Sequence, residues 1–250
     1  MPIWIQAGLW GLAAGGALVV GALVAWLIEV PQRIVASVMA FGAGVLISAL
    51  AFDLVDEAET KGGLTATVLG FLVGAVAYLL ANVVLAKRGA RHRKRSGEQQ
   101  PSEEQQGGSG SAIAIGALLD GIPESVVLGL SLLGGNGIGI PVLAAIFISN
   151  LPEGLSSAAG MKRNGRSARY VFGVWIGVAV ASGTAGLLGC LLLQGASVEL
   201  VAAITALAAG AILTMVADTM IPEAFERTHL YAGLIATLGF LTAFTIGRAG

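Results

Sequence analysis

The chain has 250 residues, of which 56% are hydrophobic and only 12% are charged, and its formal net charge at pH 7 is −1. A soluble domain of this size needs a more highly charged surface, so the composition excludes an ordinary soluble enzyme or binding module and indicates a polytopic membrane protein. The single cysteine, Cys190, excludes an internal disulfide.

Apolar stretches between charged or turn-rich breaks predict eight membrane-spanning helices, each about long enough to cross a bilayer. Their expected bounds are 3–28, 34–56, 63–86, 112–134, 138–160, 170–194, 198–221 and 231–248. Residues 87–111 begin with a basic cluster and continue with Glu, Gln, Gly and Ser, a composition that predicts a flexible loop. Residues 1–250 are therefore expected to form one all-α transmembrane domain.

Basic residues predict the orientation of these spans. All Lys and Arg residues except Lys61 and Arg248 fall in the loops after the first, third, fifth and seventh spans. The positive-inside rule places these loops, including 87–111, in the cytoplasm and both termini outside. We expect a plasma (inner) membrane location. The cluster from Lys87 to Arg95 is interpreted as an orientation signal that touches anionic lipid, with no nucleic-acid partner.

Two internal similarities predict the architecture. Segments 43–58 and 209–224 share Ala, Gly, Ala, Glu and Ala at a constant offset, on spans expected to run in opposite directions. This pattern is typical of an inverted repeat. The second similarity, Ile-Pro-Glu ending at Glu124 and Leu-Pro-Glu ending at Glu153, lies on the two spans left over. A 3+2+3 inverted-repeat arrangement follows.

The central pair of spans carries three carboxylates at membrane depth: Asp120, Glu124 and Glu153. Each costs on the order of 3 kcal/mol on insertion scales and normally has a partner. Asp120 and Glu124 are four residues apart and share a helix face. No Lys or Arg occurs between Ser96 and Met161. The sequence therefore predicts that a proton or a metal cation supplies the missing positive charge.

Further oxygen ligands are available beside these carboxylates. Ser149 and Asn150 precede Glu153 by four and three residues on the same predicted helix. Each proline of the Pro-Glu pairs also frees a backbone carbonyl four residues earlier, which needs a neighbour, water or a cation at membrane depth. The predicted metal ligands are Asp120, Glu124, Ser149, Asn150 and Glu153.

Two other aspartates are pathway or gate candidates. Asp53 belongs to an acidic group at the external end of the second span, and Asp218 lies at the cytoplasmic end of the seventh. Two interpretations stay open, a mouth that attracts cations and an ordinary solvated helix end.

The whole chain resembles the ZIP family of divalent-metal transporters. The resemblance rests on the eight spans, the polar loop after the third, the two Pro-Glu motifs and the stretch Asp-Thr-Met-Ile-Pro-Glu-Ala at 218–224. In that family the fourth span reads His-Asn-x-Pro-Glu, and its His, Asn and Glu contribute to the metal site. Here Glu124 matches, whereas Asp120 stands in for the His and Gly121 for the Asn.

This chain also departs from the family in its histidines. Its two histidines, His92 and His229, both fall in predicted loops. The resemblance therefore implies a site built from oxygen ligands alone, which favours harder ions such as Mn²⁺ or Fe²⁺ over Zn²⁺ while still allowing Zn²⁺.

The predicted function is transport of a divalent metal ion toward the cytoplasm, with the ion as substrate, no prosthetic group and no enzymatic activity. An alternative is a transport-inactive family member that serves as a metal sensor or assembly partner. An intramembrane aspartyl hydrolase using Asp53 with Asp218 or Asp120 is disfavoured, because these residues lie near opposite membrane faces. Membrane lipid and metal ions are the expected partners, and the oligomeric state is open, a homodimer included.

Overall fold

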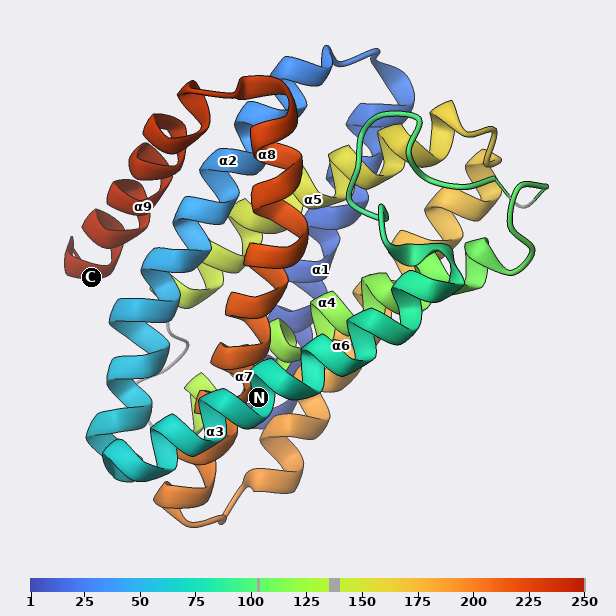
Figure 1. Ribbon diagram of the computed structural model, residues 1–250. Coiled ribbons are helices and arrows are strands. Elements are labelled where there is room, and N and C mark those ends of the chain that lie inside the picture. Colours follow the sequence, from blue (N-terminus) through green and yellow to red (C-terminus); the bar gives the residue numbers. More distant parts are fainter. Residues whose placement is uncertain (103, 135–139, 250) are drawn as a thin grey trace.

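The computed structural model describes residues 1–102, 104–134 and 140–249, and in these ranges the regular structure is entirely helical (Figure 1). Short π-helical segments continue three of the helices. The α-helices are α1 Ile3–Leu27, α2 Gln32–Ala49, α3 Val55–Leu85, α4 Ser109–Ser131, α5 Ile140–Arg163, α6 Ala168–Leu193, α7 Val198–Met215, α8 Ile221–Thr228 and α9 Tyr231–Ala249. The π-helical segments are η1 Leu50–Leu54, η2 Ala86–Ala90 and η4 Val216–Met220.

Seven helical stretches within the described residues are long and apolar enough to cross a membrane. One of them, Gln32–Ala90, has 59 residues and turns at Gly63, where φ is +76°. Glycine adopts this conformation without the steric cost that other residues meet. In Figure 1 this stretch forms two rods that meet at the lower left. The prediction of an all-helical fold is confirmed, and the described residues give seven candidate membrane spans where the sequence predicted eight.

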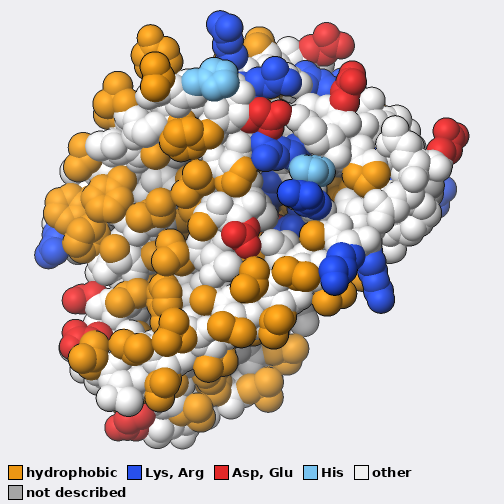
Figure 2. All heavy atoms as spheres, viewed as in Figure 1, with side chains coloured by type: hydrophobic (Ala, Val, Ile, Leu, Met, Phe, Trp, Pro, Cys, Tyr) orange, Lys and Arg blue, Asp and Glu red, His pale blue; other side chains and the backbone are white. Residues whose placement is uncertain are grey.

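The helices pack into one bundle whose outer surface is apolar. Helix α1 packs against α5 and α6, α2 against α5, α8 and α9, α3 against α7, and α4 against α6 and α7. Large side chains such as Leu69, Leu72 and Leu80 point outward from α3. Figure 2 shows hydrophobic side chains over much of the visible face. A contiguous apolar exterior of this kind suits lipid.

Two helix pairs approach each other through glycines at matching positions. A Cβ on Gly44 of α2 would lie 1.9 Å from the Ala236 oxygen of α9, and one on Gly210 of α7 would lie 2.0 Å from the Phe71 oxygen of α3. Only glycine permits backbones this close. The partner helices return the contact with Gly74 against the Leu207 oxygen and Gly239 against the Phe41 oxygen. Gly210 follows Gly44, and Gly239 follows Gly74, by nearly the same number of residues in the sequence.

Two of the π-helical segments are separated in the sequence by the same offset. Leu50–Leu54 continues α2 and Val216–Met220 continues α7, and each has five residues. Such π-helical turns are rare and occur frequently at functional sites. Asp53 lies in the first segment and Asp218 in the second. Both predicted pathway aspartates therefore occupy locally widened helix.

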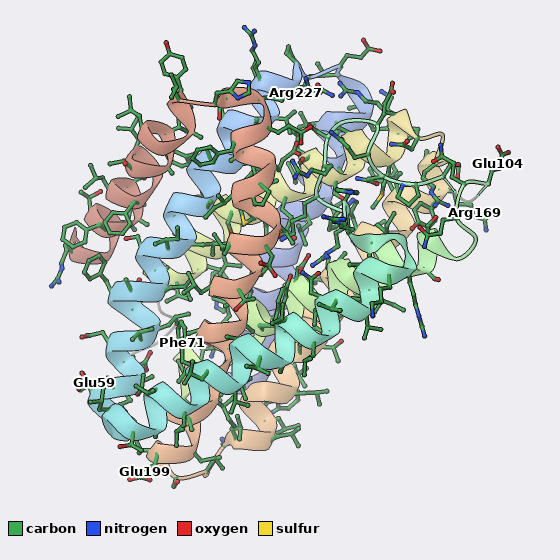
Figure 3. The ribbon with its side chains drawn as sticks, in the orientation of Figure 1. Glu59, Phe71, Glu104, Arg169, Glu199 and Arg227 are labelled. Carbon is green, nitrogen blue, oxygen red and sulfur yellow. The ribbon has the colours of Figure 1, made fainter. Side chains whose placement is uncertain are left out.

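Basic side chains gather at the end of the bundle where α1 joins α2, α5 joins α6 and α8 joins α9. Arg33, Arg163 and Arg227 lie together there and define what we call the basic end. Figure 3 shows Arg227 at this end and Glu59 and Glu199 at the opposite one. The charge asymmetry predicted from the sequence is thus present between the two ends of the fold.

Candidate functional site

The three carboxylates of the central helices are buried and lie around one point. Asp120 and Glu124 on α4 and Glu153 on α5 are only 1%, 2% and 3% exposed. Lys94 Nζ lies 2.8 Å from Glu153 Oε2 and 3.4 Å from Asp120 Oδ2. Glu124 interacts electrostatically with Glu153, Lys94 and Asp120. The two helices therefore share one polar centre inside the bundle.

The protein itself supplies the positive charge of this centre. Arg93 and Lys94 are 2% and 3% exposed and pair with Asp120 and Glu153. The prediction that a proton or metal ion had to supply this charge is therefore wrong for this state of the protein. Both residues belong to the basic cluster that was interpreted as touching lipid, which is also wrong for these two. Arg93 precedes Asp120 by 27 residues, so helix spacing could not indicate the pair.

Arg93 is held by a complete set of acceptors. Its Nε donates to Asp120 Oδ2 at 2.9 Å and its Nη2 to Oδ1 at 2.8 Å, a bidentate pair. The remaining N–H groups donate to Tyr78 Oη, Asn82 Oδ1 and the Ala90 oxygen. Burial alone would lower the pKa of Arg93, but the charge and hydrogen bonds of Asp120 outweigh it and raise this pKa above its ordinary value. A guanidinium has five donors, and all five are used.

Lys94 is held less completely. Its ammonium forms the two ion pairs described above, yet makes no hydrogen bond of good geometry to any described residue. Glu124 Oε1, also buried, has no hydrogen-bond partner among the described residues. Buried polar atoms in this condition are uncommon in native proteins and call for an explanation. The part of the centre formed by Lys94, Glu124 and Glu153 is therefore its least satisfied part.

Neighbouring helices leave room for the chain that carries these cations, residues 91–100, here called the inserted segment. A Cβ on Gly116 of α4 would lie 2.5 Å from Arg93 Cδ. A Cβ on Gly160 of α5 would lie 2.0 Å from the Arg95 oxygen. Because real Cβ atoms do not approach so closely, a side chain at Gly160 would displace the backbone of the inserted segment, and one at Gly116 would force the Arg93 side chain to shift.

Hydrogen bonds tie the inserted segment to α5 and α8. Ser156 Oγ on α5 donates to the Lys94 oxygen at 2.6 Å. The Ser96 N–H and hydroxyl donate to Glu223 Oε1 of α8 at 3.0 and 2.5 Å. Gln100 Nε2 lies within hydrogen-bond distance of three backbone oxygens, including that of Lys94's neighbour Arg93. Part of the predicted loop 87–111 thus lies inside the bundle.

Ser149 and Asn150 are buried but direct their hydrogen bonds elsewhere. Ser149 Oγ donates to the Ile146 oxygen of its own helix at 3.0 Å. Asn150 Nδ2 donates to the Ala14 oxygen of α1 at 2.9 Å. Neither bond reaches a carboxylate of the centre. Of the five predicted ligands, the structure brings together the three carboxylates.

The two pathway candidates lie in different surroundings. Asp218 is exposed and lines a cavity of about 200 Å³. Lys94 and other residues of the inserted segment line the same cavity. Asn82 Nδ2 donates to Asp218 Oδ2 at 3.3 Å while its oxygen accepts from Arg93, which links Asp218 to the centre. Asp53 is half-buried and interacts instead with Glu57, Asp56 and Arg248.

Four residues of the centre were not predicted from the sequence: Tyr78, Asn82, Arg93 and Lys94. A signal existed for two of them. Tyr78 and Asn82 are polar, four residues apart, and lie in an otherwise apolar span, so they share one helix face.

The centre can be tested for its fit to a metal ion. Within the described ranges, no group of three or more His, Cys, Asp and Glu side chains is arranged to hold one. Asp120 and Glu153 instead lie within 4.0 Å of the Lys94 ammonium group, which supplies a positive charge at the centre. Comparison with protein-family models gives no match, and neither does comparison with curated proteins. No family is assigned.

Proposed function

We propose that the chain transports a divalent metal ion, such as Mn²⁺, Fe²⁺ or Zn²⁺, which binds as substrate between Glu124 and Glu153. The observation that carries the proposal is the convergence of carboxylates from two membrane-spanning helices on one buried ammonium group. Buried carboxylates at membrane depth are costly and usually mark an ion path. Their partner here sits on the inserted segment, so it can be exchanged without unfolding a helix.

Lys94 is the cation that exchanges, and Arg93 stays in place. All five donors of Arg93 are used, whereas Lys94 makes ion pairs only. The cavity of about 200 Å³ beside Lys94 provides space for its displaced side chain. Asp218 lines the same cavity and offers the displaced ammonium group a new carboxylate partner.

Charge balance gives the stoichiometry of this exchange. Asp120 is neutralised by Arg93, and Glu153 by Lys94, which leaves Glu124 without a cation. A buried carboxyl group in this position takes up a proton. When a divalent ion replaces Lys94, both glutamates become ligands and that proton is released, as is usual when metals bind titratable ligands. Binding is therefore expected to release about one proton per ion.

The proposed architecture is eight spans in a 3+2+3 arrangement with two inverted triplets. The glycine contacts of α2 with α9 and of α7 with α3, together with the matching π-helical segments, support it. The positive-inside rule then puts the basic end in the cytoplasm and both termini outside, in a plasma (inner) membrane. Uptake runs toward the basic end, where Asp218 lies on the exit side. The ZIP-like Pro-Glu motifs of α4 and α5 support the same assignment.

The test is metal uptake into liposomes that contain the purified protein. Glu124→Gln and Glu153→Gln each remove one ligand charge, and we expect each to reduce saturable Mn²⁺ and Zn²⁺ uptake at least tenfold without loss of folded protein. Glu199→Gln is the matched control, because Glu199 is exposed at the opposite end from the basic end. Uptake that is unchanged in both glutamine variants would refute the assignment.

The second candidate function is a metal sensor or assembly partner without transport. The five hydrogen bonds that Arg93 donates and the close contacts at Gly116 and Gly160 favour this function, because they make the inserted state a well-packed resting state. A cation that binds saturably to the wild type and to Lys94→Met, with no flux through either, would favour this function over transport.

A further inference from the structure

A second cavity opens at the basic end, separate from the central carboxylates. Its volume is about 760 Å³, within the range of small-ligand sites. The side chains around it come from four parts of the chain: the start of α2, the end of α5, α8 and the inserted segment. The charged side chains among them are those of Arg33, Arg163, Arg227 and Glu98.

The cavity has an excess of positive charge. Three guanidinium groups face one carboxylate, that of Glu98. Arg33 and Arg227 form no ion pair within 4.0 Å among the described residues. Arg163 Nη1 donates to the Ser96 oxygen at 2.7 Å, which fixes this guanidinium at the cavity wall. Arginine groups set around a hollow in this way match the oxygens of a phosphate group, which they bind in a bidentate manner.

Neighbouring side chains place the cavity at the depth of lipid headgroups. Lys162, which precedes Arg163, donates from Nζ to the Trp26 oxygen at 2.8 Å and lies 5.5 Å from the centre of the Trp26 ring. Trp and Lys at the ends of spans are typical anchors at the membrane–water interface. Arg163 therefore lies at the level where the phosphate groups of a bilayer are found.

We propose that this cavity binds the phosphate headgroup of an anionic phospholipid, with Arg33, Arg163 and Arg227 as the donors. The three arginines belong to α2, α5 and α8, so one bound phosphate connects the ends of helices that are far apart in sequence. Free phosphate has the same chemistry, but the interfacial depth favours the lipid. The lipid proposal does not rest on the proposed transport.

The experiment is a native mass-spectrometry titration of the full chain in neutral detergent with phosphatidylglycerol or phosphatidylcholine of identical acyl chains. The wild type should retain phosphatidylglycerol preferentially. The double variant Arg33→Gln/Arg227→Gln should bind it about 30-fold more weakly, a factor of about five for each basic residue. The matched control is Arg88→Gln/Arg169→Gln, which removes two exposed arginines outside the cavity and should leave the affinity unchanged.

A third double variant, Arg33→Lys/Arg227→Lys, keeps the charge and loses the bidentate geometry, so its affinity should fall between those of the wild type and the glutamine variant. Equal weakening in the cavity and control variants would refute a defined site. Equal retention of phosphatidylcholine would do the same. Inorganic phosphate that displaces the lipid at equal concentration would assign the cavity to a soluble anion and overturn the lipid proposal.

Discussion

The buried ammonium group of Lys94 has two expected effects: it stabilises the metal-free protein, and it competes with metal ions for the site. Replacing Lys94 by methionine separates these effects. Methionine keeps the length and apolar stem of the side chain and removes its charge. In the native centre Lys94 Nζ lies 2.8 Å from Glu153, so the variant leaves this carboxylate without its partner. Breaking one side of a buried ion pair costs about 3 kcal/mol or more. Without metal, we therefore expect Lys94→Met to lower the free energy of unfolding by about 3 kcal/mol.

With metal present, the same substitution should have the opposite effect on binding. If Lys94 must leave before a cation enters, the apparent dissociation constant equals the intrinsic one divided by the fraction of molecules with an empty site. An occupied state favoured by about 2.7 kcal/mol leaves about 1% of molecules empty. Lys94→Met then tightens the apparent affinity by up to about 100-fold.

Both effects can be measured on detergent-purified protein. Thermal unfolding without and with Mn²⁺ or Zn²⁺ gives the stability change, and isothermal titration calorimetry gives the affinity. Lys87→Met is the matched control, because Lys87 is exposed and belongs to the same basic cluster. A Lys94→Met protein that binds the cations no more tightly than the wild type would refute the idea that the ammonium group competes with them.

Three further predictions concern the packing and the inserted segment. Gly116→Ala places a Cβ 2.5 Å from Arg93 Cδ and should cost about 1–3 kcal/mol in chemical denaturation, a cost that disappears when Arg93→Ala is present as well. Gly210→Ala, whose Cβ would lie 2.0 Å from a backbone oxygen of α3, should cost at least as much, whereas Gly173→Ala, with nothing within 4 Å, should not destabilise. Burial and two neighbouring arginines lower the pKa of His92 below 6.5, so the fold favours its neutral form. The associated stability is present above about pH 6.5 and is lost as pH falls through the lowered pKa, and His92→Gln should make the melting temperature less dependent on pH below about pH 6.5.

The bundle could be predicted from the sequence because lipid exposure imposes a simple rule on every span. An apolar stretch of sufficient length must satisfy its own backbone as a helix. The same rule made Asp120, Glu124 and Glu153 conspicuous, and the structure places all three in one buried centre. The offset that aligned Gly44 with Gly210 also relates their close contacts, while the 3+2+3 arrangement stays a prediction.

The partners of the carboxylates could not be predicted in the same way. Helix spacing indicates which residues share a face, but Arg93 and Lys94 reach the centre from a connecting segment that has no periodicity. A basic cluster after a span is usually an orientation signal, and nothing in its composition separates these two residues from their exposed neighbours Lys87 and Arg88. The room left by Gly116 is visible only when the segment is in place.

The orientation of Ser149 and Asn150 shows a related limit. Their spacing from Glu153 predicted further ligands beside it, yet their hydrogen bonds go to the Ile146 and Ala14 oxygens. A serine hydroxyl within a helix often bonds the carbonyl of the preceding turn, and an amide bonds whichever helix packs beside it. Sequence spacing therefore could not predict the hydrogen-bond partner of either residue.

The central claim, that a divalent cation displaces Lys94 from Glu153, can be tested by the reactivity of the lysines themselves. Lys94 is 3% exposed and should react slowly with a water-soluble amine reagent, whereas exposed Lys87 should react quickly and serve as the internal reference. Mass spectrometry should then show Lys94 labelling that rises saturably with added Mn²⁺ or Zn²⁺ while Lys87 labelling is constant. Lys94 that stays unreactive at every cation concentration would contradict the account.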